Sequence, residues 1–129
     1  MNELVIDHIA RCKRLTDDQI DALSDAWKSR EDHARIAPAA EVKKLSDAWG
    51  KAEANARKNA GDELDKVMLA IIYAILFQAG SYSEVIKRAF WSPRIVGVAL
   101  LAKEKIWGPE FELLVEPWVS VMGRTFESV

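Results

Sequence analysis

The chain has 129 residues, of which 50% are hydrophobic and 29% are charged, and its formal net charge at pH 7 is -2. This balance is typical of one globular domain with its own core, and it excludes an intrinsically disordered chain. The small net charge provides no field that would attract nucleic acid or an anionic membrane to the whole molecule. Cys12 is the only cysteine, so no intramolecular disulfide can form. Because the start of the sequence also lacks a signal-peptide pattern, we expect a cytoplasmic location.

Apolar residues recur with helical spacing along the chain, and no alternating strand pattern with a hairpin turn occurs. The first helix is predicted over residues 3–14. Thr16 and Gln19 have the spacing of a capping box, which predicts a second helix from there. Pro38 stands where a first-turn proline would begin the third. We therefore expect an all-α fold, a single-domain bundle of five to seven helices over residues 1–129.

The most regular feature is a five-residue repeat. The sequence Leu-Ser-Asp-Ala-Trp occurs at residues 23–27 and again, 22 residues later, at residues 45–49. This offset is close to six helical turns, so the Leu and Trp of both copies should lie on matching faces. The third helix continues the pattern with apolar residues at strict helical spacing: Val42, Leu45, Trp49, Ala52 and Ala56. We expect residues 14–60 to form an amphipathic antiparallel hairpin packed along Leu and Trp.

Residues 62–123 are expected to form the apolar helical core. Gly61-Asp62 ends the hairpin, with Asp62 as the N-cap of the next helix. Residues 67–79 are apolar nearly all round, which predicts a buried central helix. That run is shorter than the ~20 residues that a membrane-spanning helix needs, so we expect no membrane insertion.

Three further helices are predicted after this central one. A second capping box at residues 81–84 would begin a short helix that runs through Phe90. Ser92 and Pro93 read as the N-cap and first residue of another, which would end at Gly108-Pro109. The last helix, over residues 111–122, is expected to be broken by Pro117.

Motifs that carry chemistry are weak in this sequence. His8 and Cys12 stand one helical turn apart, and the nearest further metal ligands are Glu31, Asp32 and His33. The second ligand cluster of a zinc site is missing, as are the Glu-x-x-His pairs of di-iron bundles. No phosphate-binding loop, nucleophile elbow or dinucleotide fingerprint occurs. We expect no metal, no cofactor and no enzymatic activity, with a ligand pocket in the apolar carboxyl half as an open alternative.

Five tryptophans are the main indication of function. Trp and Arg are enriched at the residues that dominate protein interfaces, although two helical tryptophans can also simply pack on each other. The candidate partner-binding residues lie on the predicted hairpin: Trp27, Arg30, Arg35, Trp49 and Arg57. We therefore expect a non-enzymatic helical module that binds a protein partner or a second copy of itself.

Residues 83–98 support an alternative function. Their layout, a short helix, a turn and a second helix, resembles a helix-turn-helix, and Lys87, Arg88 and Arg94 could contact phosphates. However, Phe90 takes the turn position usually held by Gly, and Ile95 on the would-be recognition helix cannot read base edges through hydrogen bonds. The alternative is a DNA-binding regulator that uses this segment.

Three short stretches resemble a known set of proteins. They are Leu-Thr-Asp-Asp-Gln at residues 15–19, the two Ala-Trp pairs, and the stretch from Glu116 to Gly123. Together they are similar to small Ala/Trp-rich helical proteins of actinobacteria and their phages, over roughly half of the chain. This resemblance implies a small accessory protein of a phage or mobile element. If the chain is encoded by a phage, we expect the protein that it binds and modulates to be a host protein.

Overall fold

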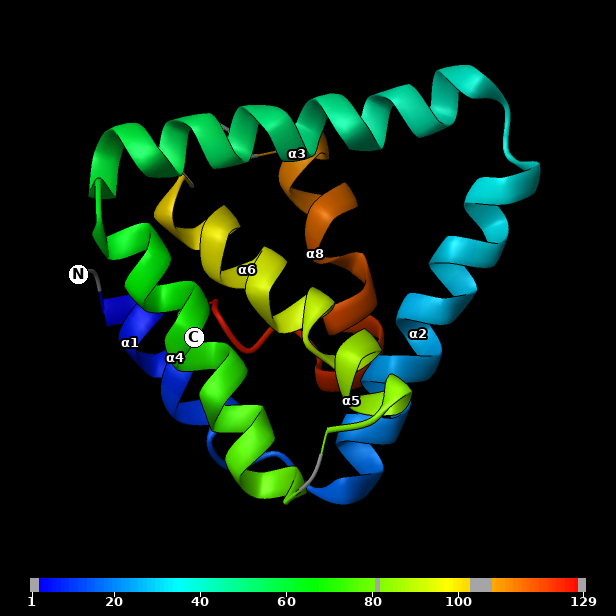
Figure 1. The fold of residues 1–129 in the computed structure, drawn as a ribbon. Coiled ribbons are helices and arrows are strands. Elements are labelled where there is room, and N and C mark those ends of the chain that lie inside the picture. Colours follow the sequence, from blue (N-terminus) through cyan, green and yellow to red (C-terminus); the bar gives the residue numbers. More distant parts are fainter. Residues whose placement is uncertain (1–2, 81, 103–107, 128–129) are drawn as a thin grey trace.

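The computed structural model describes residues 3–80, 82–102 and 108–127, and its fold is an all-α bundle (Figure 1). No strand occurs in these residues, and none of their helices is long and apolar enough to cross a membrane. The described helices, in chain order, are α1 (Glu3–Cys12), α2 (Asp17–Ile36), α3 (Ala39–Ala60), α4 (Glu63–Ala79), α5 (Glu84–Ala89), α6 (Trp91–Leu101) and α8 (Pro109–Met122).

Local signals place several helix ends correctly. The Thr16 side chain accepts a hydrogen bond from the Gln19 backbone N–H at 3.1 Å, and the Gln19 side chain accepts one from the Thr16 N–H at 2.9 Å. The predicted capping box of α2 is therefore confirmed. At α5 the capping side chain is Ser83, which accepts from the Ile86 N–H, whereas the predicted cap, Ser81, lies outside the described residues.

Other ends differ from the prediction. Asp62 precedes α4 as expected, but its side chain makes no capping hydrogen bond. Helix α6 begins at Trp91, so Ser92 is not its N-cap but a buried residue of its first turn. It ends at Leu101; the predicted continuation toward Gly108 falls partly on residues 103–107, outside the described part. Helix α8 is continuous through Pro117, where a break was predicted.

Helix α6 is the central helix of the bundle. It packs against each of the other six described helices, and eight of its 11 residues are buried. In Figure 1, α2, α3 and α4 run along three sides of a triangle, with α6 and α8 inside it. The prediction that residues 67–79 would be the buried central helix is therefore wrong. Helix α4 lies at the edge and buries only one side, with Leu64, Val67, Ile71, Ala74 and Ile75.

The predicted hairpin of α2 and α3 does not form. The two helices follow each other in sequence but diverge from their connection at residues 37–38 (Figure 1). Helix α2 packs mainly on α5 and α8, and α3 packs mainly on α6, α8 and α4. Trp27 consequently stacks on Trp91 at the start of α6, with ring centroids 5.7 Å apart, rather than on Trp49. The short connection was misleading because helices farther along the sequence cover the apolar sides of α2 and α3.

The two copies of the repeat also bury different faces. In the first copy both Leu23 and Ser24 are buried. In the second copy the corresponding Leu45 is half-buried and Ser46 is exposed. The buried positions of α3 are Ala48, Ala52 and Ala56, which are four residues apart on one side of the helix. Small side chains at these positions let α3 approach α6 closely. Leu45 and Trp49 pack only on the margin of the core.

Gly97 marks the closest approach between α6 and α4. A Cβ atom added there would lie 2.8 Å from Cδ1 of Ile71 and 3.3 Å from Cγ1 of Val67, both on α4. Such distances are too short for a methyl group in a packed interior, so a side chain on residue 97 would require the end of the Ile71 side chain to move and would crowd Val67.

We predict that Gly97→Ala lowers the free energy of unfolding by about 1 kcal/mol, because displacing the end of the Ile71 side chain and crowding Val67 outweighs the higher helix propensity of alanine. Gly50→Ala is the matched control. Gly50 also lies within a helix, but an added Cβ there meets nothing within 4 Å, so its replacement should stabilise the protein by about 0.5–1 kcal/mol. Urea unfolding measures both values. Equal effects of the two substitutions would contradict the close contact.

Candidate functional site

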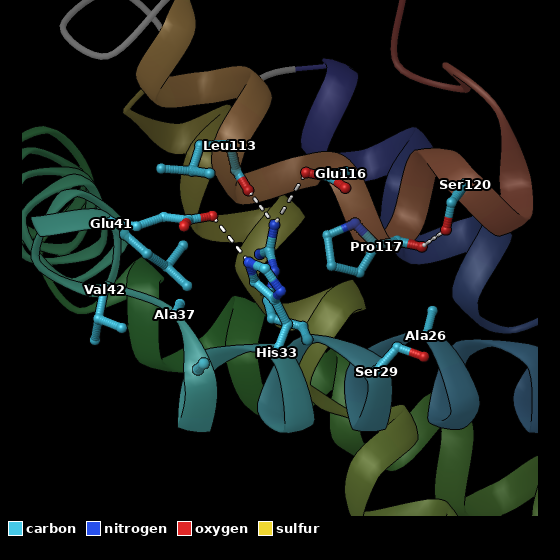
Figure 2. A pocket seen from close by; sticks show the side chains of 13 residues that line it. Ala26, Ser29, His33, Ala37, Glu41, Val42, Leu113, Glu116, Pro117 and Ser120 are labelled. Carbon is cyan, nitrogen blue, oxygen red and sulfur yellow. Dashed lines mark hydrogen bonds and ion pairs between the residues drawn. The ribbon is translucent and has the colours of Figure 1, made fainter. Parts of the chain in front are cut away.

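A pocket opens in the corner where α2, α3 and α8 meet (Figure 2). Its volume is about 420 Å³, within the range of small-ligand sites. Alanine, valine, leucine and proline side chains make up the apolar part of its wall. The polar part consists of Ser29, Arg30, His33, Glu41, Glu116 and Ser120. The pocket exists because α2 and α3 diverge, so it could not follow from a prediction that packed them together.

Arg30 links α2 to α8 at the wall of this pocket. Its Nη2 donates a hydrogen bond of 2.5 Å to the backbone carbonyl of Leu113. In a regular helix that carbonyl would accept from residue 117, but Pro117 has no N–H to donate. Arg30 therefore supplies the donor that the proline removes. This hydrogen bond is consistent with α8 continuing through Pro117.

The Arg30 guanidinium is only partly neutralised. Its side chain is 13% exposed, and its acidic neighbour Glu116 lies 3.6 Å away with 73% of its own side chain exposed. Burial lowers the pKa of Arg30 from its usual value, and Glu116 opposes that shift. Within the described part of the chain, the buried Nη1 atom has no hydrogen-bond partner. The pocket thus contains a desolvated cation whose hydrogen-bonding capacity is not filled.

His33 and Glu41 form the opposite side of the pocket. Nε2 of His33, near the end of α2, lies 2.9 Å from Oε1 of Glu41, in the first turn of α3. Figure 2 shows this pair between α2 and α3, with Pro117 and Glu116 across the space. The pair connects the two diverging helices at their corner. Glu41 is thus already engaged, which leaves Glu116 as the loosely held carboxylate of the pocket.

The five predicted partner-binding residues do not form one surface. Arg30 lies in the pocket, while Trp27 is half-buried against Trp91. Arg35 is exposed near the end of α2, 3.8 Å from Asp32. Trp49 packs on the margin of the core, and Arg57 pairs with Asp65 of α4 at 3.4 Å. Arg35 and Arg57 flank opposite ends of α3, a helix about 33 Å long.

The three cations of the alternative DNA-binding hypothesis are poorly placed to contact DNA phosphates. They are Lys87, Arg88 and Arg94. Arg94 is half-buried, with its Cζ 4.9 Å from the centroid of the Trp91 ring, and burial lowers its pKa. Arg88 lies near Asp32 of α2, whose pKa is lowered chiefly by a hydrogen bond from Lys28 and further by Arg35 and Arg88. Lys87 is exposed. The would-be recognition helix is α6, and a helix in the centre of the bundle cannot enter a groove of DNA.

His8 and Cys12 are part of the core rather than a reactive pair. His8 donates from Nε2 to the Pro93 carbonyl at 2.7 Å, and its ring meets that of Trp118 edge to face at 4.8 Å. Burial lowers the pKa of His8 to about 4 and raises that of Cys12 to about 12. A thiol with so high a pKa supplies no thiolate nucleophile near neutral pH. Across the described residues, no group of three or more His, Cys, Asp or Glu side chains is placed to hold a metal ion.

Sequence reasoning missed one surface. On the outer side of α4, Leu69, Tyr73 and Phe77 are 49%, 63% and 90% exposed, and they stand four residues apart on one side of the helix. We name these three residues the α4 apolar face. The signal was present in the sequence, because a helix that is apolar all round requires cover on every side. The described helices cover only one side of it.

Comparison of the chain with protein-family models, curated proteins and solved structures finds no match. The resemblance to actinobacterial and phage proteins therefore stays an expectation, and the function has to be argued from the geometry alone.

The role assigned to Arg30 can be tested with a double-mutant cycle. Arg30→Ala should lower the free energy of unfolding by about 2 kcal/mol, since it removes a charged donor from a partly buried carbonyl. In a Pro117→Ala background residue 117 regains its N–H, so the same substitution should cost about 1 kcal/mol less. Arg35→Ala, at an exposed position of the same helix, should change stability by less than about 0.5 kcal/mol. Equal costs of Arg30→Ala in both backgrounds would contradict this role.

Burial of His8 predicts loss of stability in mild acid. The pKa of His8 is about 4 in the folded protein against 6.5 in a model peptide, so the unfolded chain binds a proton first as the pH falls. Stability should therefore be complete above about pH 6.5 and fall toward pH 4, at up to about 1.4 kcal/mol per pH unit. Between pH 5 and pH 6.5, the free energy of unfolding measured in urea should change more steeply with pH for wild type than for His8→Gln. Parallel slopes would show that His8 can be protonated within the fold.

Proposed function

We propose that this chain is a protein-interaction domain without catalytic chemistry, and that it associates with a second copy of itself through the α4 apolar face. The observation that supports this most is Phe77, which is 90% exposed at the end of a stripe that also exposes Leu69 and Tyr73. Single exposed apolar residues are common on protein surfaces, but a contiguous stripe along a helix is typical of an interaction site.

The spacing of the stripe suits a second copy of the same helix. Leu69 and Phe77 lie four residues on either side of Tyr73, which is about 6 Å along the helix axis in each direction. If two copies of α4 pack antiparallel, with Tyr73 at the two-fold axis, Leu69 of each copy lies against Phe77 of the other. This is a self-complementary contact, the type found in two-fold dimers.

The charges of α4 favour the antiparallel arrangement. Its first turn carries Glu63 and Asp65, and its last turn has no basic residue. In a parallel pair the two acidic first turns would lie side by side and repel each other. In an antiparallel pair they lie at opposite ends, and the two helix dipoles are opposed, which is the favourable orientation. The overall net charge of -2 adds little further repulsion between copies.

The size of the stripe indicates a weak dimer. A fully exposed aromatic side chain presents about 200 Å² of surface, so the three residues together offer about 400 Å² on each copy. A stable interface of standard size buries about 800 Å² per partner. We therefore expect an association in the micromolar range that depends on concentration, rather than an obligate dimer.

We predict that Phe77→Glu abolishes this association, because it places a charge opposite Leu69 of the second copy. Sedimentation velocity over a roughly hundredfold range of concentration measures the shift from monomer to dimer. Ile36→Glu is the matched control: Ile36 is 83% exposed on α2, outside the stripe, and its replacement should leave the association intact. A wild-type protein that stays monomeric throughout, or equal effects of the two substitutions, would refute the proposal.

A further inference from the structure

We propose that the pocket between α2, α3 and α8 binds a small organic carboxylate with an apolar body, and that the ligand takes the place of Glu116 beside Arg30. This binding function is independent of the self-association proposed above, because α4 contributes no residue to the pocket wall. The inference rests on three features: a buried guanidinium that is incompletely paired, a weakly held carboxylate beside it, and an apolar wall.

The guanidinium provides the specificity. Arg30 already uses Nη2 to hold the Leu113 carbonyl, and its partner Glu116 stands 3.6 Å away, beyond hydrogen-bond distance. In the described part of the structure Nη1 is both buried and unpartnered. A ligand carboxylate has two oxygens and pairs well with a guanidinium fork. In the place of Glu116 it would neutralise Arg30 at shorter range through Nη2, and a turn of the guanidinium toward the pocket would also give Nη1 an acceptor.

A ligand can readily displace the Glu116 carboxylate from its position beside Arg30. Its side chain is 73% exposed, so it can turn into water at little cost in desolvation. Ion pairs of such exposed carboxylates contribute only about 0–1 kcal/mol. A free carboxylate that also buries an apolar body gains an additional contribution that Glu116 cannot make.

The rest of the wall is suited to the apolar body of the ligand. Val42 and Ala37 line one side, and Leu113 and Pro117 line the other, as Figure 2 shows. The volume of about 420 Å³ fits a small aliphatic or aromatic acid. Glu41 is hydrogen-bonded to His33 and Glu116 can turn outward, so Arg30 is the cation in the pocket wall that a carboxylate ligand would recognise.

The opposite ligand charge fits less well. An amine drawn to Glu116 would stand beside the Arg30 guanidinium, and like charges at short range repel strongly where water is scarce. A neutral amide would fill the apolar space without neutralising Arg30. Three probes of equal length therefore separate these possibilities: hexanoate, hexylamine and hexanamide.

The experiment is a titration of isotope-labelled full-length protein with each probe, followed by NMR chemical shifts. We expect hexanoate to bind and to shift resonances of pocket residues on α2, α3 and α8, with weaker or no binding of the other two probes. Glu116→Gln removes the competing carboxylate and should tighten hexanoate binding about two- to fivefold. Glu112→Gln is the control, since it removes an acid from α8 that lies outside this pocket wall.

Three results would overturn the inference. One is no shift with hexanoate at any concentration. The second is weaker hexanoate binding in Glu116→Gln than in Glu112→Gln. The third is hexylamine binding that exceeds hexanoate binding and is lost in Glu116→Gln, which would make Glu116 the recognition group. Because Glu116 is largely exposed, its replacement is not expected to unfold the protein, so each outcome can be measured. If sedimentation velocity shows that the protein does not self-associate, the NMR titration still tests the pocket.

Discussion

The packing of α4 against the central helix α6 determines which side of α4 is left exposed. Ile71 of α4 reaches the space that a side chain on residue 97 would occupy, and Val67 lies beside it. The buried side of α4 carries Val67 and Ile71, together with Leu64 and Ile75. Because a helix has only one inward side, Tyr73 and Phe77 must point outward. The exposed apolar face is thus a consequence of how α4 packs, and not a defect of the core.

A second constraint shapes the other side of the molecule. Pro117 deprives the Leu113 carbonyl of its helical donor, and Arg30 of α2 provides a replacement. This hydrogen bond joins α2 to α8, whereas α3 packs on α6 through its row of alanines. Helices α2 and α3 therefore pack against different neighbours. The pocket at their corner, with its incompletely paired cation, follows from that divergence.

Local signals in the sequence predicted the fold class and several helix ends. The Thr16 capping box, the Gly61-Asp62 junction and the end of the last helix before Gly123 depend on residues close in sequence. The pairing of helices was not predictable in this way. The Leu-Trp repeat shows which residues are apolar, but several helices can cover them, and the choice depends on the shape of the whole core.

The candidate sites were predictable only in part. Arg30 was identified, but as one of a surface group with Trp27 and Trp49, because its bond to Leu113 joins residues 83 positions apart. Phe77 was assigned to the core because nothing in the sequence limits how many sides of α4 the other helices cover. In both cases the missing information was long-range packing, which residue spacing alone does not contain.

The central claim is that α4 exposes its apolar face in the monomer and covers it by self-association, while α6 and α8 form the permanent core. Hydroxyl-radical footprinting of the protein, dilute and concentrated, tests this directly at the level of side chains. We expect Tyr73 and Phe77 to be oxidised readily in dilute solution and protected when concentrated, with Phe111 and Trp118 protected in both. Protection of Tyr73 and Phe77 in dilute solution, or oxidation of Trp118 as fast as Phe77, would contradict the account.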